Sequence, residues 1–416
     1  MRYLHKFLFT LVSIPVLVTL IGLMFFVSSS PVFSQQSSLK IYIDADRTGA
    51  AASGLSIEQG VRAGLTSYGN QLNGRDVEVV IRDHRGSTPR SKRHLNEFLK
   101  DKDALLVVSG LHSPPLLANR DFINQNKILT LDPWAAAGPI TRPATDENWI
   151  FRLSVDDTKA GEMITRFAAK EGFKKPYLLL EDTGWGNSNL KTMSGAIKNT
   201  DGAMMGVSRF KWGVGRSESD AIAIKIKNSG ADVVFLVANA SEAKPLLEAL
   251  MNNPATKHMP VRSHWGIAGG SFAEESKKIV QQLDLKFLQT KFSFLDEENS
   301  AVEQQAFALA QKLYPETIVN KTDIKAPTGF IHAFDLMLLL NEAAKSVSWS
   351  GDIQQDRLAL KNALEQLNKP IHGLVKTYTQ PFQPYLVSNP DAHEALGIND
   401  LAMGQFDESG SIRLVK

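Results

Sequence analysis

The chain has 416 residues, more than one ordinary domain needs, and 43% hydrophobic with 22% charged residues is the composition of a folded protein. It has no cysteine, which excludes disulfides, thiolate catalysis, zinc–thiolate sites and an N-terminal lipid-modified cysteine. Its 46 basic and 44 acidic residues nearly balance, and Arg2 and Lys6 account for the difference. Because a neutral body lacks the basic footprint that nucleic acid requires, we expect no nucleic-acid partner.

Residues 1–34 have the pattern of an export segment. A basic start precedes the uncharged stretch 7–27, and Val32 and Ser34 then occupy the positions of a cleavage site. The apolar stretch is longer than that of most signal peptides and long enough to cross a bilayer. Two alternatives follow, a signal peptide that is removed and an anchor that is retained, and both export the body of the protein.

From residue 39 onward, short β-branched runs alternate with stretches of helical periodicity, which indicates βα units on parallel sheets. The first expected strands are 39–45, 77–81, 105–108 and 128–131. Asn73-Gly74 marks a tight turn between the first two of them. One expected helix carries apolar residues at positions 57, 61 and 65, and the next begins with Ser87-Thr88-Pro89 as cap and first turn.

A second α/β set begins near Asp156, which we expect to cap a helix to about residue 171. The expected strands are 177–180, 204–210, 233–237, 261–264 and 285–292. The expected helices are 187–198, 219–228, 241–250, 272–281, 301–314, 327–345 and 354–367, and short strands follow at 374–378, 402–406 and 412–415. Two such sets predict two lobes, with a ligand site between them at the carboxyl ends of their strands.

Several short motifs follow one another in a fixed order. They are Thr48-Gly49, Leu72-Asn73-Gly74-Arg75, the stretches 107–113, 128–133 and 151–157, Glu181-Asp182-Thr183-Gly184-Trp185-Gly186, and the stretch 373–378. Their order and spacing resemble those of type I periplasmic solute-binding proteins. These are the extracytoplasmic receptors of ABC importers, whose best-known members bind leucine, isoleucine and valine. The resemblance covers nearly all of the chain beyond residue 39.

The resemblance implies an α/β fold of two doubly wound parallel-sheet lobes joined by three hinge crossovers, near 154–156, 287–292 and 373–379. Lobe 1 would comprise residues 39–155 and 291–372. Lobe 2 would comprise residues 156–290 and 373–416. Such crossovers allow two lobes to close on a ligand.

The resemblance also implies which residues face the cleft. They are Ser113, Trp134, Ala136, Trp185, Asn239 and Trp265, and His112, which precedes Ser113, is a further candidate for the same site. Ser113 stands where the family offers a hydroxyl to a ligand carboxylate, and the alternative is a plain helix N-cap before two prolines. Trp134, Ala136, Trp185, Asn239 and Trp265 stand where the amino-acid binders have, in this order, a small residue, a threonine, a tyrosine, a second aromatic residue and an acidic residue. These replacements argue against an α-amino acid as the ligand.

Three tryptophans follow expected strand ends, at Trp134, Trp185 and Trp265. Aromatic faces stack on planar ligands or hold cations. The alternative is that the indoles pack within loop cores, as large aromatic side chains often do. Asp132, Asp182 and His112 are candidate polar anchors for the same ligand.

The sequence offers little for catalysis or metal binding. The nine histidines are scattered, and there is no His-Glu-x-x-His, Gly-x-Ser-x-Gly or Walker pattern. Glu181 and Asp182 are adjacent on a strand and should point to opposite faces, so they do not form an acid–base pair. Asp391, His393 and Glu394 are interpreted as a solvated loop. We therefore expect no enzyme activity, no metal and no cofactor.

The expected function is that of a solute-binding receptor of an ABC importer, located in the periplasm and either free or tethered to the inner membrane by residues 7–27. It would act as a monomer, closing two lobes on a small amino-acid-like, amide or aromatic planar ligand for delivery to an inner-membrane permease. The alternative is a ligand-sensing subunit that acts on a separate membrane signalling partner.

Overall fold

The computed structural model describes residues 37–296 and 300–415, so the predicted export segment lies outside the described residues. Within the described part of the chain, no helix combines the length and the apolar character needed to cross a bilayer.

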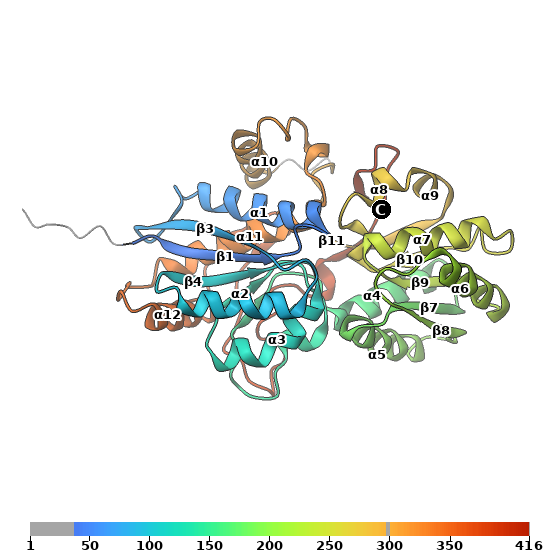
Figure 1. The fold of residues 1–416 in the computed structure, drawn as a ribbon, viewed down its shortest axis with the longest axis horizontal. Coiled ribbons are helices and arrows are strands. Elements are labelled where there is room, and N and C mark those ends of the chain that lie inside the picture. The colour runs from blue at the N-terminus through green and yellow to red at the C-terminus, as the bar shows by residue number, and fades with distance from the viewer. Residues whose placement is uncertain (1–36, 297–299, 416) are drawn as a thin grey trace, which may run out of the picture. The chain divides into compact units, whose positions relative to one another are not determined.

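The first sheet has six strands in the order β2-β3-β1-β4-β5-β6 (Figure 1). The strands are β1 (Leu39–Ala45), β2 (Gln71–Leu72), β3 (Arg75–Asp83), β4 (Ala104–Ser109), β5 (Thr130–Asp132) and β6 (Ile150–Arg152). All pairs are parallel except β2 with β3, which the Asn73-Gly74 turn joins as a hairpin. The helices between them are α1 (Ala51–Thr66), α2 (Thr88–Lys100) and α3 (Ser113–Gln125).

The second sheet has seven strands in the order β15-β14-β11-β10-β9-β7-β8, of which β14 and β15 are antiparallel. The strands are β7 (Pro176–Glu181), β8 (Gly206–Phe210), β9 (Val233–Val237), β10 (Val261–Ser263), β11 (Leu285–Thr290), β14 (Leu401–Phe406) and β15 (Ile412–Leu414). The helices are α4 (Asp157–Lys170), α5 (Gly184–Lys198), α6 (Arg216–Ser229), α7 (Ala240–Asn252), α8 (Phe272–Glu275) and α9 (Lys277–Gln282). The single helix expected over 272–281 is interrupted at Ser276, whose backbone is not helical.

The chain then returns to the first lobe. The helices α10 (Ala301–Leu313), α11 (Pro327–Ala344) and α12 (Ile353–Glu365) follow, with the short strands β12 (Ile371–His372) and β13 (Thr377–Tyr378). Helix α11 packs on α1, and the buried Ser56 hydroxyl donates to the Ala326 carbonyl and accepts from the Phe330 N–H (Figure 1). Lobe 1 is therefore built from segments far apart in the sequence.

The boundaries of the lobes remain predictions. The contacts of one segment bear on the position of the last crossover, which we expect near 373–379. The backbone N–H groups of Leu374 and Val375 and the Tyr378 hydroxyl donate to the buried Asp335 carboxylate in α11. The imidazole of His393 stacks on Phe151 of β6, with ring centroids 3.8 Å apart. The chain thus lies against lobe 1 beyond residue 379 and joins the second sheet only with β14.

The solvated loop expected around His393 and Glu394 is wrong. His393 is fully buried, and the Glu394 carboxylate accepts from Arg152 Nε at 2.9 Å and from a second guanidinium nitrogen at 2.6 Å. Arg152 is itself fully buried, and a buried cation requires a paired anion. Asp391, by contrast, leaves half of its side chain exposed while pairing with Arg142.

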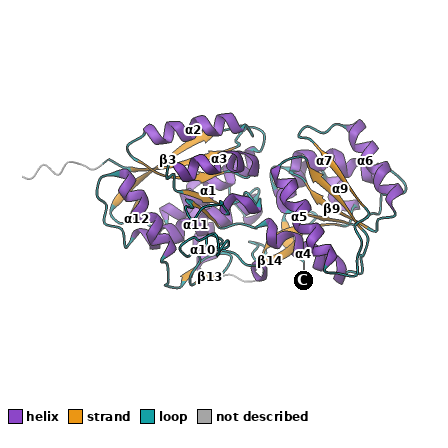
Figure 2. Cartoon of the chain, turned by 90° about the horizontal axis from the view of Figure 1, so that it is seen from below, coloured by secondary structure: helices purple, strands orange, loops and turns teal. Residues whose placement is uncertain are grey.

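The two lobes share one architecture. Figure 2 shows the strands of each lobe between helices, which is the layering of α/β folds (Figure 2). The predicted α/β class with two parallel-sheet lobes is confirmed, and the additions to it are antiparallel strands at sheet edges. Because the strands are covered on both sides, ligands can be reached only at the strand ends.

Candidate functional site

All seven residues predicted for the cleft line one small pocket. Each lies just after the carboxyl end of β4, β5, β7, β9 or β10, in the loop or in the first turn of the helix that follows the strand. The lining is completed by Leu111, Pro114 and Gly266, which the sequence reasoning missed although each is adjacent to a predicted residue. The structure brings these residues together, and their contact with a ligand stays a prediction.

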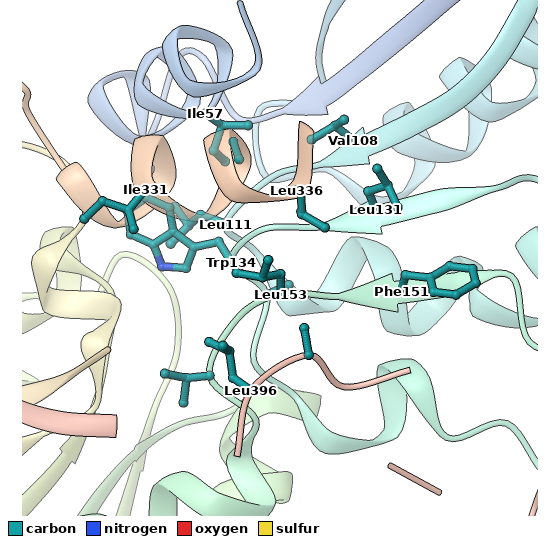
Figure 3. Packing of buried hydrophobic residues seen from close by; sticks show 14 of the residues in the cluster. Ile57, Val108, Leu111, Leu131, Trp134, Phe151, Leu153, Ile331, Leu336 and Leu396 are labelled. Carbon is teal, nitrogen blue, oxygen red and sulfur yellow. The ribbon is translucent and has the colours of Figure 1, made fainter. Parts of the chain in front are cut away.

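The three predicted tryptophans fill most of this pocket, which we call the tryptophan pocket. Trp134 is fully buried, Trp265 is 1% exposed and Trp185 is 5% exposed. The remaining volume is about 10 Å³, room for about a single water molecule. Figure 3 shows the Trp134 indole next to Ile331 and Leu111, within the core of lobe 1 (Figure 3).

The Trp265 indole connects the two lobes. Trp265 follows β10 of lobe 2, and its ring centroid lies 6.1 Å from that of Trp134 after β5 of lobe 1. It lies 5.3 Å from the ring of His332, which belongs to α11. Burial lowers the pKa of His332 to about 3, so this imidazole is neutral at physiological pH. The contact between the lobes here is therefore aromatic and uncharged.

Two glycines show how closely the indoles are packed. A Cβ at Gly266 would lie 2.7 Å from a ring carbon of Trp185 and 2.5 Å from the Ala238 carbonyl oxygen. A Cβ at Gly329 would lie 2.9 Å from a ring carbon of Trp134. Since contacts under about 3 Å are repulsive, any larger residue would displace an indole or the backbone.

A buried carboxylate fixes the orientation of the Trp185 ring. Asp157, the first residue of α4, accepts from Trp185 Nε1 at 3.2 Å and from Asn189 Nδ2 at 2.8 Å. His264 Nε2 lies 3.0 Å from the same oxygen and is its third donor, because His264 Nδ1 accepts from the Trp265 N–H. The Trp185 N–H is therefore already paired within the protein.

The Trp134 indole has the opposite arrangement. Its Nε1 is buried and has no hydrogen-bond partner in the described structure. Leaving a buried donor unpaired costs about 1–3 kcal/mol, so native proteins rarely do so without a reason. His112 Nδ1, in the same pocket, also lacks a partner there. Both nitrogens belong to residues that line the tryptophan pocket.

The side chains of His112 and Ser113 each have a hydrogen-bond partner within the protein. His112 Nε2 lies 3.2 Å from Asp46 Oδ2. Burial raises the pKa of Asp46, but hydrogen bonds from His112 and from the Gly49 and Thr48 N–H groups outweigh it and hold that pKa below its usual range. Ser113 is the first residue of α3 and not its cap, which is His112, and its hydroxyl accepts from the Ala137 N–H at 3.2 Å. The N-cap interpretation of Ser113 is therefore wrong by one residue.

Glu181 and Trp212 extend the site beyond the predicted residues. Glu181 is fully buried, and its carboxylate accepts from Asn239 Nδ2 at 2.9 Å and from the Thr183 hydroxyl at 2.9 Å. Burial raises the pKa of Glu181, although the hydrogen bonds from Trp212 and Thr183 act to lower it. The Trp212 ring follows β8 of lobe 2 and lies 5.1 Å from the His112 ring of lobe 1. Its place just after a strand end is a signal that sequence reasoning had available for Trp212.

Two proposed polar anchors do not reach the pocket. Asp132 is fully buried, where its Oδ1 accepts from the backbone N–H groups of Trp134 and Ala135, and burial raises its pKa to about 7. Asp182 leaves 48% of its side chain exposed and pairs with Arg209. Glu181, the last residue of β7, is thus buried, whereas Asp182, the first residue beyond the strand, faces solvent, so the two do not form an acid–base pair. Within the described residues, no three histidine, aspartate or glutamate side chains gather as a metal would require.

Comparisons with known proteins agree with this architecture. The family described as periplasmic binding protein matches residues 42–410, whereas no curated protein matches the chain. A solute-binding protein of R. palustris in complex with benzoate has 17% identity and a TM-score of 0.73 over 91% of this chain and 96% of its own. A type 1 periplasmic binding protein of Bordetella pertussis has 16% identity and a TM-score of 0.75 over 91% and 100%.

A third similar structure is the branched-chain amino acid transporter substrate binding protein of Streptococcus pneumoniae, in complex with isoleucine. It has 17% identity and a TM-score of 0.72 over 91% of this chain and 100% of its own. The match to the family covers every loop of the tryptophan pocket and all strands of the two sheets except β15 and the first residues of β1. The chain belongs to the periplasmic binding protein family and has its type I fold.

Proposed function

We propose that this protein is the receptor of an ABC importer and binds a small planar aromatic or amide solute in the tryptophan pocket. The observation that carries the proposal is the convergence of three indoles from both lobes on one pocket that retains an unpaired Trp134 N–H. Indole faces supply flat apolar contact, and the free N–H supplies a donor for a carbonyl or carboxylate oxygen. The R. palustris protein bound to benzoate has the same fold, which supports an aromatic acid as one candidate.

Binding requires the two lobes to separate. The volume left between the indoles is about one water molecule, so a solute of several atoms fits only after Trp265 or its lobe has moved. A solute that contacts both lobes then binds the re-closed arrangement better than the open one, and it shifts the hinge equilibrium toward closure. The closed form is the species that we expect an inner-membrane permease to recognise.

Isothermal titration calorimetry with benzoate, benzamide, phenylalanine and leucine tests the proposal. Trp185→Ala should weaken the binding of the best of these solutes by about three- to tenfold, because an aromatic pair is worth about 0.5–1.5 kcal/mol. Trp349→Ala is the matched control, since Trp349 lies on lobe 1 with its N–H donating to the Leu72 carbonyl. Unchanged affinity in a folded Trp185→Ala protein, or an equal loss in the control, would contradict the proposal.

A further inference from the structure

A second and larger pocket also lies between segments of the two lobes. Its volume is about 70 Å³ and it opens to solvent. Lobe 2 contributes residues 267–274 and the β14–β15 hairpin, and the segments 292–295 and 324–327 face them on the way into α10 and α11. None of the seven predicted residues lines it, although it begins two residues after Trp265.

The walls of this pocket are rich in phenylalanine, and we call it the phenylalanine pocket. Phe272 and Phe406 stack on the lobe 2 side with centroids 5.8 Å apart. Phe292 and Phe294 meet edge to face on the other side with centroids 5.1 Å apart. Aromatic rings prefer such offset and edge-to-face neighbours, so the two pairs favour a third ring between them.

One buried amide supplies a directed polar contact. Gln289, at the end of β11, lines the pocket and is 5% exposed. Its Oε1 accepts from the Thr328 hydroxyl at 3.2 Å, whereas its Nε2 has no partner in the described residues. An amide nitrogen can only donate, so the group that satisfies it is an oxygen acceptor.

Charge at the pocket argues for an uncharged acceptor. Lys325 pairs with Glu274 at 2.7 Å across the rim, and Lys321 pairs with Glu303 at 2.5 Å. Among the described residues that line the pocket, the charged side chains are Glu274, Lys321 and Lys325, and each of them already has a counter-ion. A carboxylate would be buried without a free cation, whereas a carbonyl needs only the Gln289 donor.

We propose that the phenylalanine pocket is a second binding site, for a small uncharged aromatic compound that carries a carbonyl group. The ring lies between the two phenylalanine pairs, and the carbonyl oxygen accepts from Gln289 Nε2. Because the pocket is open, a ring that exceeds its enclosed volume extends toward the mouth. This site is separate from the tryptophan pocket, so a failure of the function proposed above leaves it standing.

Calorimetry with acetophenone on the whole protein tests this site. We expect a binding event that Gln289→Leu weakens by about three- to tenfold, the effect of one neutral hydrogen bond. Toluene lacks the acceptor, so its binding should not fall in that variant. Trp349 lines neither pocket, so Trp349→Ala should leave acetophenone binding unchanged. Absence of acetophenone binding, equal affinity in Gln289→Leu, or a matching loss in Trp349→Ala would each overturn the proposal.

A positional measurement on the unmodified protein guards against a misfolded variant. Crystals grown with 4-bromoacetophenone should give an anomalous bromine peak between Phe272 and Phe294. A peak confined to the tryptophan pocket, or none at full ligand concentration, would refute the assignment.

Discussion

The Trp265 indole gives the sharpest test of how the two lobes are held together. Its ring is 1% exposed, and it contacts Trp134 and His332 across the boundary between the lobes. Trp265→Ala removes this aromatic contact without introducing charge. Trp149→Ala is the matched control, because Trp149 is equally buried but lies beside β6 within lobe 1, with Lys361 of α12 over its ring.

The two variants should differ in magnitude. Truncating a tryptophan within a single core costs about 3–5 kcal/mol. In a unit of 150–250 residues, each kcal/mol lowers Tm by about 2–4 °C, so Trp149→Ala should lower Tm by about 6–20 °C. The Trp265 ring loses part of its contact whenever the lobes separate, even though each lobe stays folded. Trp265→Ala should therefore lower the free energy of unfolding by less than Trp149→Ala does. Trp265→Ala should instead increase the population of separated lobes.

Calorimetry and small-angle X-ray scattering distinguish these outcomes. We expect Trp265→Ala to have the smaller fall in Tm and a larger radius of gyration than the unmodified protein. Trp149→Ala should have the larger fall in Tm with an unchanged radius of gyration. If Trp265→Ala instead loses as much stability as the control and keeps the same radius, the indole belongs to the core of lobe 2 alone and the reasoning is refuted.

Two further substitutions test buried chemistry near the site. The folded pKa of Asp132 is about 7, above its unfolded value, so its contribution to stability is complete below about pH 4 and is lost as pH rises toward 7. Asp132→Asn should therefore gain stability relative to the unmodified protein over that range, by up to about 4 kcal/mol, and parallel pH profiles in urea titrations would contradict this. Gly266→Ala should cost about 1–3 kcal/mol, because its Cβ would collide with Trp185 and the Ala238 carbonyl. The control Gly195→Ala has open space in helix α5 and should be neutral or stabilising in thermal melts, so equal losses in the two alanine variants would argue against the collision.

Local sequence rules determined most of the elements of this protein. Ser87 accepts from the Arg90 N–H and Asp156 from the Thr158 N–H, as helix caps should. Glu181 at the end of β7 is buried, and Asp182, the first residue beyond the strand, is half exposed. The resemblance to periplasmic solute-binding proteins predicted the residues of the site, and the seven that it led to line one pocket at the carboxyl ends of parallel strands. The inferences about helix caps use only neighbours in the chain.

Tertiary structure alone decided what the gathered residues contact. The sequence places Trp134 and Trp265 at strand ends, but only the packing of one lobe on the other turns their rings toward each other. Likewise, Glu394 is buried and not part of a solvated loop because it pairs with the buried Arg152, which stands more than 200 residues earlier in the chain. Such pairings follow from which distant segments share an interior, and the energy of burying a ring or a charge depends on that partner and not on the residues beside it in sequence.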